Sequence, residues 1–166
     1  MQDNIKRIVG SMPAGAPRRE LETMLAAIAD RLSSQATATA GLVIKTGGSA
    51  LAKTGAAAYH GTADGVPVTI AASTDMPALV GSITAAYYNV FCFFIDSAST
   101  VTVAMGTEGA TRAAVKFPTF PPKKALVGYL VVTYASAFTG GTTPLDTATT
   151  QYVSPVGAFD PTILLG

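Results

Sequence analysis

The stretch YYNVFCFFI, residues 87–95, is the longest apolar run of the chain and is interrupted only by Asn89. Aromatic and β-branched residues of this kind are typical of strands, so the run predicts a strand of the core. It is far shorter than the roughly 20 apolar residues that a membrane-spanning helix needs. The first residues, MQDNIKRIVG, also lack the apolar centre of a signal peptide. We therefore expect neither a membrane anchor nor export by a signal.

Similar short runs continue on both sides of this stretch, from Leu42 onward, cut by Gly, Pro, Asp and Ser. Turn signals recur about every 8 to 12 residues, which is the pattern of a sandwich or barrel. We expect a β-sandwich domain over 42–166. Its expected strands are 42–46, 56–60, 66–72, 87–95, 100–105, 113–117 and 125–135, with a weaker one at 151–154.

The turns between these strands carry their own signals. Asp64-Gly65 predicts a tight hairpin, because both residue types accept positive φ, and residues 96–99 can close a second one. The prolines of FPTFPP, residues 117–122, remove ladder donors, so this segment should be an extended connection or an edge. Residues 138–150, FTGGTTPLDTATT, are expected to form an exposed loop.

One helix is predicted before the strands, over residues 17–35. Pro17 suits its start, and Glu20 and Glu22 lie in its first turn. Spacings of 4, 3 and 4 residues place four apolar side chains on one stripe, like the seam of a coiled coil. The stripe consists of Leu21, Leu25, Ile28 and Leu32.

Two interpretations of this stripe stay open. The helix docks on its own domain as an ordinary amphipathic helix, or it forms a short parallel bundle with copies of itself. Residues 36–41, an Ala- and Thr-rich linker, favour the bundle slightly because they separate the helix from the strands. Residues 1–16 are then an N-terminal arm.

Charge is scarce along the whole chain. Charged residues make up 13% of it, about half of the roughly 25% usual in soluble domains, while 49% are hydrophobic. Such a surface is weakly protected against association, so we expect partner subunits to cover much of it, a Thr-rich monomer surface being the alternative. The net charge of +1, with Lys and Arg concentrated in neither half, predicts no nucleic-acid partner and no membrane partner.

GGSALAKTG, residues 47–55, resembles a phosphate-binding loop in which Ala52 replaces the second glycine. Such a loop works only when a helix follows it, and AAAYHGTADG follows here with two glycines and a hairpin signal. NVFCFFID, residues 89–96, ends on an acid as a Walker B strand does, but so does any buried strand before a turn. We interpret Lys53 and Thr54 as loop or interface residues.

Catalytic and metal-binding groups are few. His60 is the sole histidine and Cys92 the sole cysteine, and the acids stand singly in turn-like contexts. We expect His60 at the surface end of a strand and Cys92 buried as a small hydrophobe, with no disulfide within the chain. The sequence thus predicts no metal, no cofactor and no enzyme, although a pair of carboxylates brought together by folding is invisible in it.

The aromatic side chains are expected to be mostly core, with a minority acting as interface anchors. The residues concerned are Tyr87, Tyr88, Phe91, Phe93, Phe94, Phe117, Phe120, Tyr129 and Tyr134.

Seven landmarks of the chain resemble, in their order, structural proteins of tailed-bacteriophage virions. The resemblance covers residues 41–164 and includes no catalytic motif. The landmarks are KTGGSALAKT, STDMPALVG, NVFCFFID, AMGTEGA, FPTFPPKKALVGYLVV, GGTTPLD and VGAFDPTIL.

This resemblance implies a mainly β fold, an antiparallel β-sandwich or jelly-roll-like domain preceded by one N-terminal α-helix. It implies a homotrimer or other small homo-oligomer that decorates or cements the capsid surface by binding the major capsid protein. The arm would dock on the shell through Ile5, Lys6, Arg7 and Ile8. A receptor-binding module of a tail fibre or spike, which recognises its host through residues 138–150, is the alternative.

Overall fold

The structure is a computed structural model that describes residues 16–159 of the chain, without the side chains of Ala16 and Pro17. Helix α2 (Ala16–Ser33) comes first and a 3-10 turn, η1 (Arg112–Ala114), lies among the strands. The strands are β1 (Gln35–Ala38), β2 (Val43–Ile44), β3 (Ala52–Lys53), β4 (Tyr59–Ala63), β5 (Val66–Ile70), β6 (Ser82–Ile83), β7 (Tyr88–Ile95), β8 (Val101–Met105), β9 (Ala125–Thr133), β10 (Phe138–Thr139) and β11 (Thr149–Val153).

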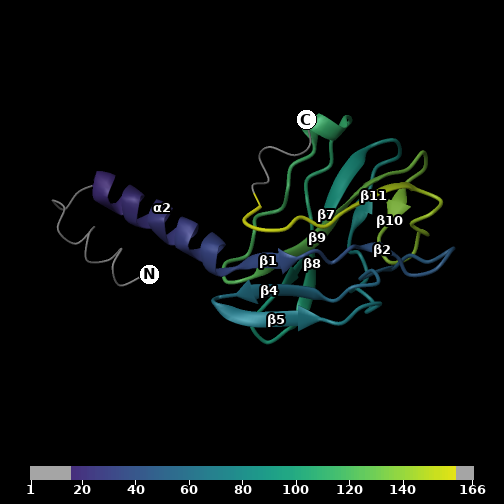
Figure 1. Ribbon diagram of the computed structural model, residues 1–166. Helices are drawn as coiled ribbons and strands as arrows, with labels where there is room; N and C mark the ends of the chain where they lie inside the picture. The colour runs from purple at the N-terminus through teal and green to yellow at the C-terminus, as the bar shows by residue number, and fades with distance from the viewer. Residues whose placement is uncertain (1–15, 160–166) are drawn as a thin grey trace.

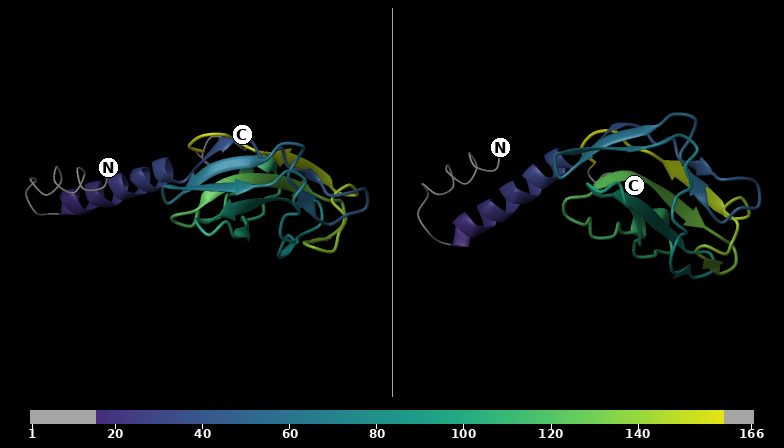
Figure 2. Two further views of the ribbon diagram at one scale, coloured as in Figure 1. Left: turned by 60° about the horizontal axis from the view of Figure 1, so that its bottom comes forward. Right: turned by 90° about the horizontal axis from the view of Figure 1, so that it is seen from below.

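The strands form two facing antiparallel sheets. The larger has the order β11-β9-β7-β8 and the smaller the order β1-β4-β5, while β2-β3 and β6-β10 are short separate pairs. Side chains of both sheets, among them Tyr59, Val68, Phe91 and Leu130, share the main hydrophobic core between the layers (Figures 1 and 2). The predicted fold class is confirmed: the protein is mainly β, antiparallel and sandwich-like, with one N-terminal helix.

The larger sheet is buried on both faces. Phe91 and Phe93 point into the main core, whereas Val90, Cys92 and Phe94 belong to a second cluster on the outer face. That outer cluster is covered by the segment after β8, including Val115, Phe117 and Phe120, and by Phe159. Burial on both faces explains why β7 and β9 read as continuous apolar runs and not as alternating ones.

Both predicted hairpins are confirmed. Ala63 pairs with Val66, and the two residues between them, Asp64 and Gly65, have φ of 52° and 77°, as a type I′ turn requires. In the β7–β8 hairpin the Asp96 carboxylate accepts backbone N–H bonds from Ala98 and Thr100. These bonds, the Thr100 one foremost, hold the pKa of Asp96 below its usual range. The FPTFPP segment is an extended connection, as expected.

Three expectations for the β region need correction. Residues 113–117 form part of η1 and a single bridge from Lys116 to Thr107 instead of a strand, because Val115 and Phe117 alternate to cover a sheet face and not to join a ladder. Residues 36–41, expected as a linker, instead contain most of β1, which pairs with β4. The loop 138–150 is only partly exposed: it contains β10, and Phe138 and Leu145 are both buried at 1% exposure.

Helix α2 extends away from both sheets (Figures 1 and 2). Eighteen residues at about 1.5 Å each make it roughly 27 Å long. It runs from Ala16 to Ser33, close to the predicted range 17–35, and its C-terminal end leads directly into β1. No described helix is long and apolar enough to span a bilayer.

Candidate functional site

The apolar stripe of α2 faces solvent in this chain. Ile28 and Leu32 are 48% and 47% exposed, and Leu21 and Leu25 are half-buried. Monomeric proteins rarely leave a row of large apolar side chains open in this way. The interpretation in which the helix docks the stripe on its own domain is therefore wrong for Ile28 and Leu32.

Met24 widens the stripe and was not included in the sequence prediction. It is the most exposed of the large apolar side chains on the helix, at 55%. It lies three residues after Leu21 and four before Ile28, so it shares their face. This spacing could have identified Met24 from the sequence, but Met24 does not occupy an a or d position and was therefore left out of the predicted stripe. Near the start of the helix Arg18 forms an ion pair with Glu22, one turn later, at 3.1 Å.

The last turn of the helix is fixed to two loops of the β domain. The Asp30 carboxylate accepts a 2.8 Å bond from the backbone N–H of Lys123. The carbonyl of Ser33 accepts a 2.8 Å bond from Gly65, and the Ser34 hydroxyl accepts one from the backbone N–H of Asp64. Lys123 Nζ then lies 3.0 Å from Asp64 Oδ2, which links the two loops. The helix direction is thus set by the β domain.

Aromatic packing adds to this junction. The Arg31 guanidinium carbon lies 4.4 Å from the centre of the Phe120 ring, a cation–π contact. Phe120 stacks on Phe159 with ring centres 6.0 Å apart, and Phe117 meets both rings edge-on. The FPTFPP connection therefore supports the base of the helix as well as the outer cluster.

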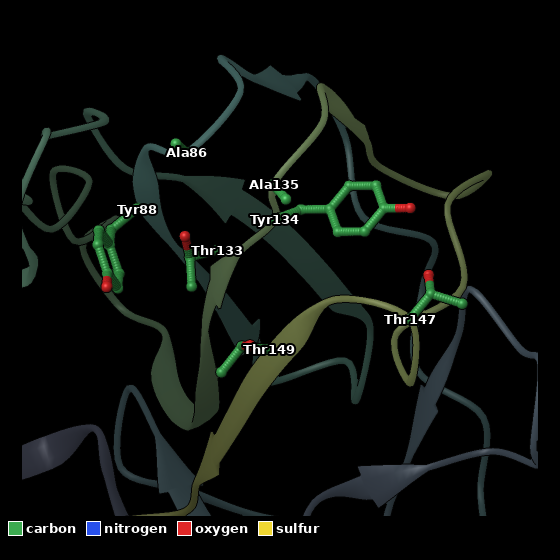
Figure 3. Close-up of a pocket in the computed structure, with 7 residues that line it drawn as sticks. All are labelled: Ala86, Tyr88, Thr133, Tyr134, Ala135, Thr147 and Thr149. Atoms are coloured by element: carbon green, nitrogen blue, oxygen red, sulfur yellow. The ribbon is translucent and has the colours of Figure 1, made fainter.

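A cleft of about 350 Å³ lies at the end of the larger sheet where β7 begins and β9 ends (Figure 3). Register explains its composition: Tyr88 pairs with Thr133, and Thr133 pairs with Thr149, so the three side chains form one row across three strands. Its lining is Ala86, Tyr88, Thr133, Tyr134, Ala135, Thr147 and Thr149. Sequence reasoning had no signal for this cleft, because only strand pairing brings these residues together.

The phosphate-loop candidate has no helix behind it. Ala52 and Lys53 form β3, and Thr54 is buried with its hydroxyl bonded to the carbonyl of Ala71 at 2.8 Å. Lys53 bridges to Asp75 through the backbone. Thr54 lies in the connection after β3, as expected of a loop residue, and its buried hydroxyl ties this connection to the segment after β5. Lys53, also expected in a loop or interface, is instead part of β3.

The single histidine and cysteine lie as predicted. His60 is an exposed residue of β4, with Nδ1 3.1 Å from the Thr69 hydroxyl. Cys92 is fully buried in β7, and burial raises the pKa of its thiol. Within residues 16–159 no three His, Cys, Asp or Glu side chains gather in a way that could hold a metal ion.

The aromatic residues divide between the two clusters and the surface. Phe91, Phe93, Phe94 and Tyr129 are buried, as predicted for the core, whereas Tyr87 is 38% exposed. Tyr88 and Tyr134 are half-buried and line the cleft. The proposed docking residues of the arm, Ile5, Lys6, Arg7 and Ile8, lie outside the described residues, and their role stays a prediction.

Comparison with known proteins gave no match: no protein-family model, no curated protein and no solved structure corresponds to this chain. Function must therefore be inferred from the helix, its junction with the β domain, and the cleft.

Proposed function

We propose that the protein is a non-enzymatic structural component of a tailed-phage virion that self-associates through α2 and decorates or cements the capsid surface. The observation that carries this proposal is the exposed stripe on a helix whose base is fixed to the β domain. The order of landmarks along residues 41–164, which resembles virion structural proteins of tailed phages, supplies the biological setting.

A second copy of the chain is the occupant that fits the stripe. An isolated helix of this length is marginal in water, so burial of its apolar face is needed to keep it formed. Each half-exposed Ile28, Leu32 or Met24 side chain would gain about 1–2 kcal/mol when buried. The stripe carries no charge, so copies can meet along it without leaving a charge unpaired.

The residue types along the stripe favour a bundle of more than two helices. In a heptad frame Leu25 and Leu32 occupy a positions, while Leu21 and Ile28 occupy d positions. Leu at a with Ile at d, the combination that Leu25 and Ile28 form, shifts parallel coiled coils toward trimers and tetramers. Met24, at a g position, broadens the apolar face in the same direction. A homotrimer is the smallest assembly that fits this pattern.

Parallel association would gather the β domains at one end of the bundle. The C-terminal end of every helix is joined to its own domain, so the N-terminal ends would point together toward the shell. Weak capsid contacts by each copy then act together, since the second contact becomes intramolecular once the first has formed. Attachment to the intact shell stabilises it by mass action.

The self-association step is tested with Leu25→Asp/Ile28→Asp, measured by light scattering coupled to size exclusion. We expect the mass of a monomer, whereas the wild type has the mass of a trimer or another small oligomer. The control is Ala26→Asp/Ala27→Asp, which adds the same charge on exposed positions outside the stripe and loses at least as much helix propensity. An oligomer that survives the first variant contradicts the role of the helix.

The location is tested by separating heads from tails of the virion and quantifying this chain by mass spectrometry. Hundreds of copies on heads support decoration. A few tens or fewer on tails would instead support the receptor-binding module. Absence from both fractions would overturn the virion proposal.

A further inference from the structure

The cleft at the end of the larger sheet is separate from the helix and its junction. Its floor is the row Tyr88, Thr133 and Thr149, which adjacent strands hold in register. Tyr134 is turned to the other face of the sheet, against the main core, and its ring points away from this row toward Thr147 (Figure 3). A volume of about 350 Å³ is at the small end of the range for sites that take small molecules.

The lining offers hydroxyl groups that the protein does not use. The hydroxyls of Tyr88, Thr133, Tyr134 and Thr149 make no hydrogen bond to any residue in the described range 16–159. The Thr147 hydroxyl, in contrast, donates to the carbonyl of Pro144 at 2.9 Å. The free hydroxyls of Thr133 and Thr149 thus lie in one row with the half-buried Tyr88 ring on the outer face of the sheet, and each can donate or accept.

One wall of the cleft is held in an unfavourable backbone conformation. Ala86 has φ of 63° in a turn closed by a bond from the N–H of Tyr87 to the carbonyl of Thr84, a position that favours glycine. Glu108 braces this turn, because its carboxylate accepts 2.8 Å bonds from both the N–H and the hydroxyl of Thr84. Backbone strain of this kind is found disproportionately at ligand-binding walls.

The charges around the cleft exclude most ligand classes. Its lining contains no Asp, Glu, Lys, Arg or His, so an ionic ligand would find no counter-charge there. Glu108, which accepts bonds from Thr84 in the turn before Ala86, places a negative charge beside this wall and disfavours an anion there. A neutral ligand that is rich in hydroxyls and flat enough to lie against the Tyr88 ring fits this lining.

We propose that this cleft binds a neutral carbohydrate, with one sugar ring against Tyr88 and its hydroxyls bonded to Thr133 and Thr149. A sugar ring presents apolar C–H groups on its faces and hydroxyls around its rim, which matches the Tyr88 ring beside the two threonine hydroxyls of the same row. Binding is weak at a single cleft and gains avidity when several copies act together. The proposal does not depend on the virion function.

The test is saturation-transfer NMR on the full chain with methyl glycosides of glucose, galactose, mannose and N-acetylglucosamine, and with sialyllactose as a charged probe. We expect saturable, millimolar binding of at least one neutral glycoside and weaker binding of sialyllactose. Thr133→Val/Thr149→Val removes two hydroxyls while keeping strand-forming side chains, and it should raise Kd about tenfold or more. Thr142→Val, at an exposed position outside the cleft, is the matched control and should leave Kd unchanged.

The outcomes are distinct. Neutral glycoside binding that the double variant weakens and the control preserves supports the cleft as the site. No binding of any neutral glycoside, stronger binding of sialyllactose, or binding that both variants retain would overturn the proposal. Circular dichroism of each variant shows that a lost signal is not a lost fold.

Discussion

Asp30 in the helix accepts a 2.8 Å hydrogen bond from the backbone N–H of Lys123, a residue far along the chain. Lys123 has φ of 62°, so the loop turns sharply at the point where it meets the helix. Its side chain continues to Asp64 at the tip of the first hairpin. One residue thus connects the helix, the loop before β9 and the β4–β5 turn.

Replacing Asp30 should loosen the helix without unfolding the sheets. Asp30→Ala leaves the Lys123 N–H without its acceptor, at a cost of about 0.5–1.5 kcal/mol. We expect faster hydrogen exchange in the last two turns of α2 and in residues 121–124. Asp30→Asn, which keeps an acceptor oxygen, should restore most of the protection. Equal exchange in wild type and Asp30→Ala would show that the bond does not hold the helix.

Ala86→Gly should stabilise the protein. Glycine adopts the φ of 63° without a Cβ clash, and this gain exceeds its larger unfolded-state entropy. We expect the free energy of unfolding, measured by urea denaturation, to increase by about 0.5–1 kcal/mol. Ala85→Gly, at the neighbouring turn position, should destabilise instead. Equal losses in the two variants would contradict the strain at Ala86.

Glu108 should contribute stability that disappears in acid. Hydrogen bonds from the N–H and the hydroxyl of Thr84 lower the pKa of Glu108 in the folded protein. The stabilisation of the fold by ionised Glu108 is therefore fully present above the pKa of this residue in the unfolded chain, about 4.3. It is lost as the pH falls through the lower pKa of Glu108 in the folded protein. The Tm difference between wild type and Glu108→Gln should be constant above about pH 5 and narrow below about pH 4. A difference independent of pH would refute the assignment.

Cys92 should be unreactive until the protein unfolds. It is fully buried in β7, and burial raises its thiol pKa, so little thiolate forms and reagents cannot reach it. We expect its reaction with a disulfide reagent such as DTNB to follow the urea unfolding curve. Because Cys92 is the only cysteine, the whole signal reports on this strand. Rapid labelling of the native protein would mean that the outer face of β7 is open.

The long elements could be predicted from the sequence because the local propensities of their residues favour the same structure as their burial in the core. Asp64-Gly65 specifies its turn alone, and the apolar runs of β7 and β9 need only to be buried. β1 was missed because QATA carries little strand propensity and depends on pairing with β4. The two-residue strands β3, β6 and β10 likewise exist only through their partners.

The two candidate sites also differ in how far the sequence could predict them. The helix stripe follows from spacing along one element, so four of its residues could be found, although their exposure could not. The cleft depends on the register of Tyr88, Thr133 and Thr149, which lie on three strands far apart in sequence. No pattern along the chain records such a register.

The direct passage from α2 into β1 also determines how the molecule bears mechanical load. A pull on the helix acts along β1, whose hydrogen bonds to β4 run across that direction (Figure 1). A force along β1 therefore loads these hydrogen bonds in shear, and they share it. A force that pulled one end of the strand away from the sheet would instead break them one after another. Ala36 adds a bond on the other side, since its carbonyl accepts from the Gly157 N–H at 2.7 Å. We therefore expect a protein that is tethered through α2 to resist mechanical separation of the helix from the β domain.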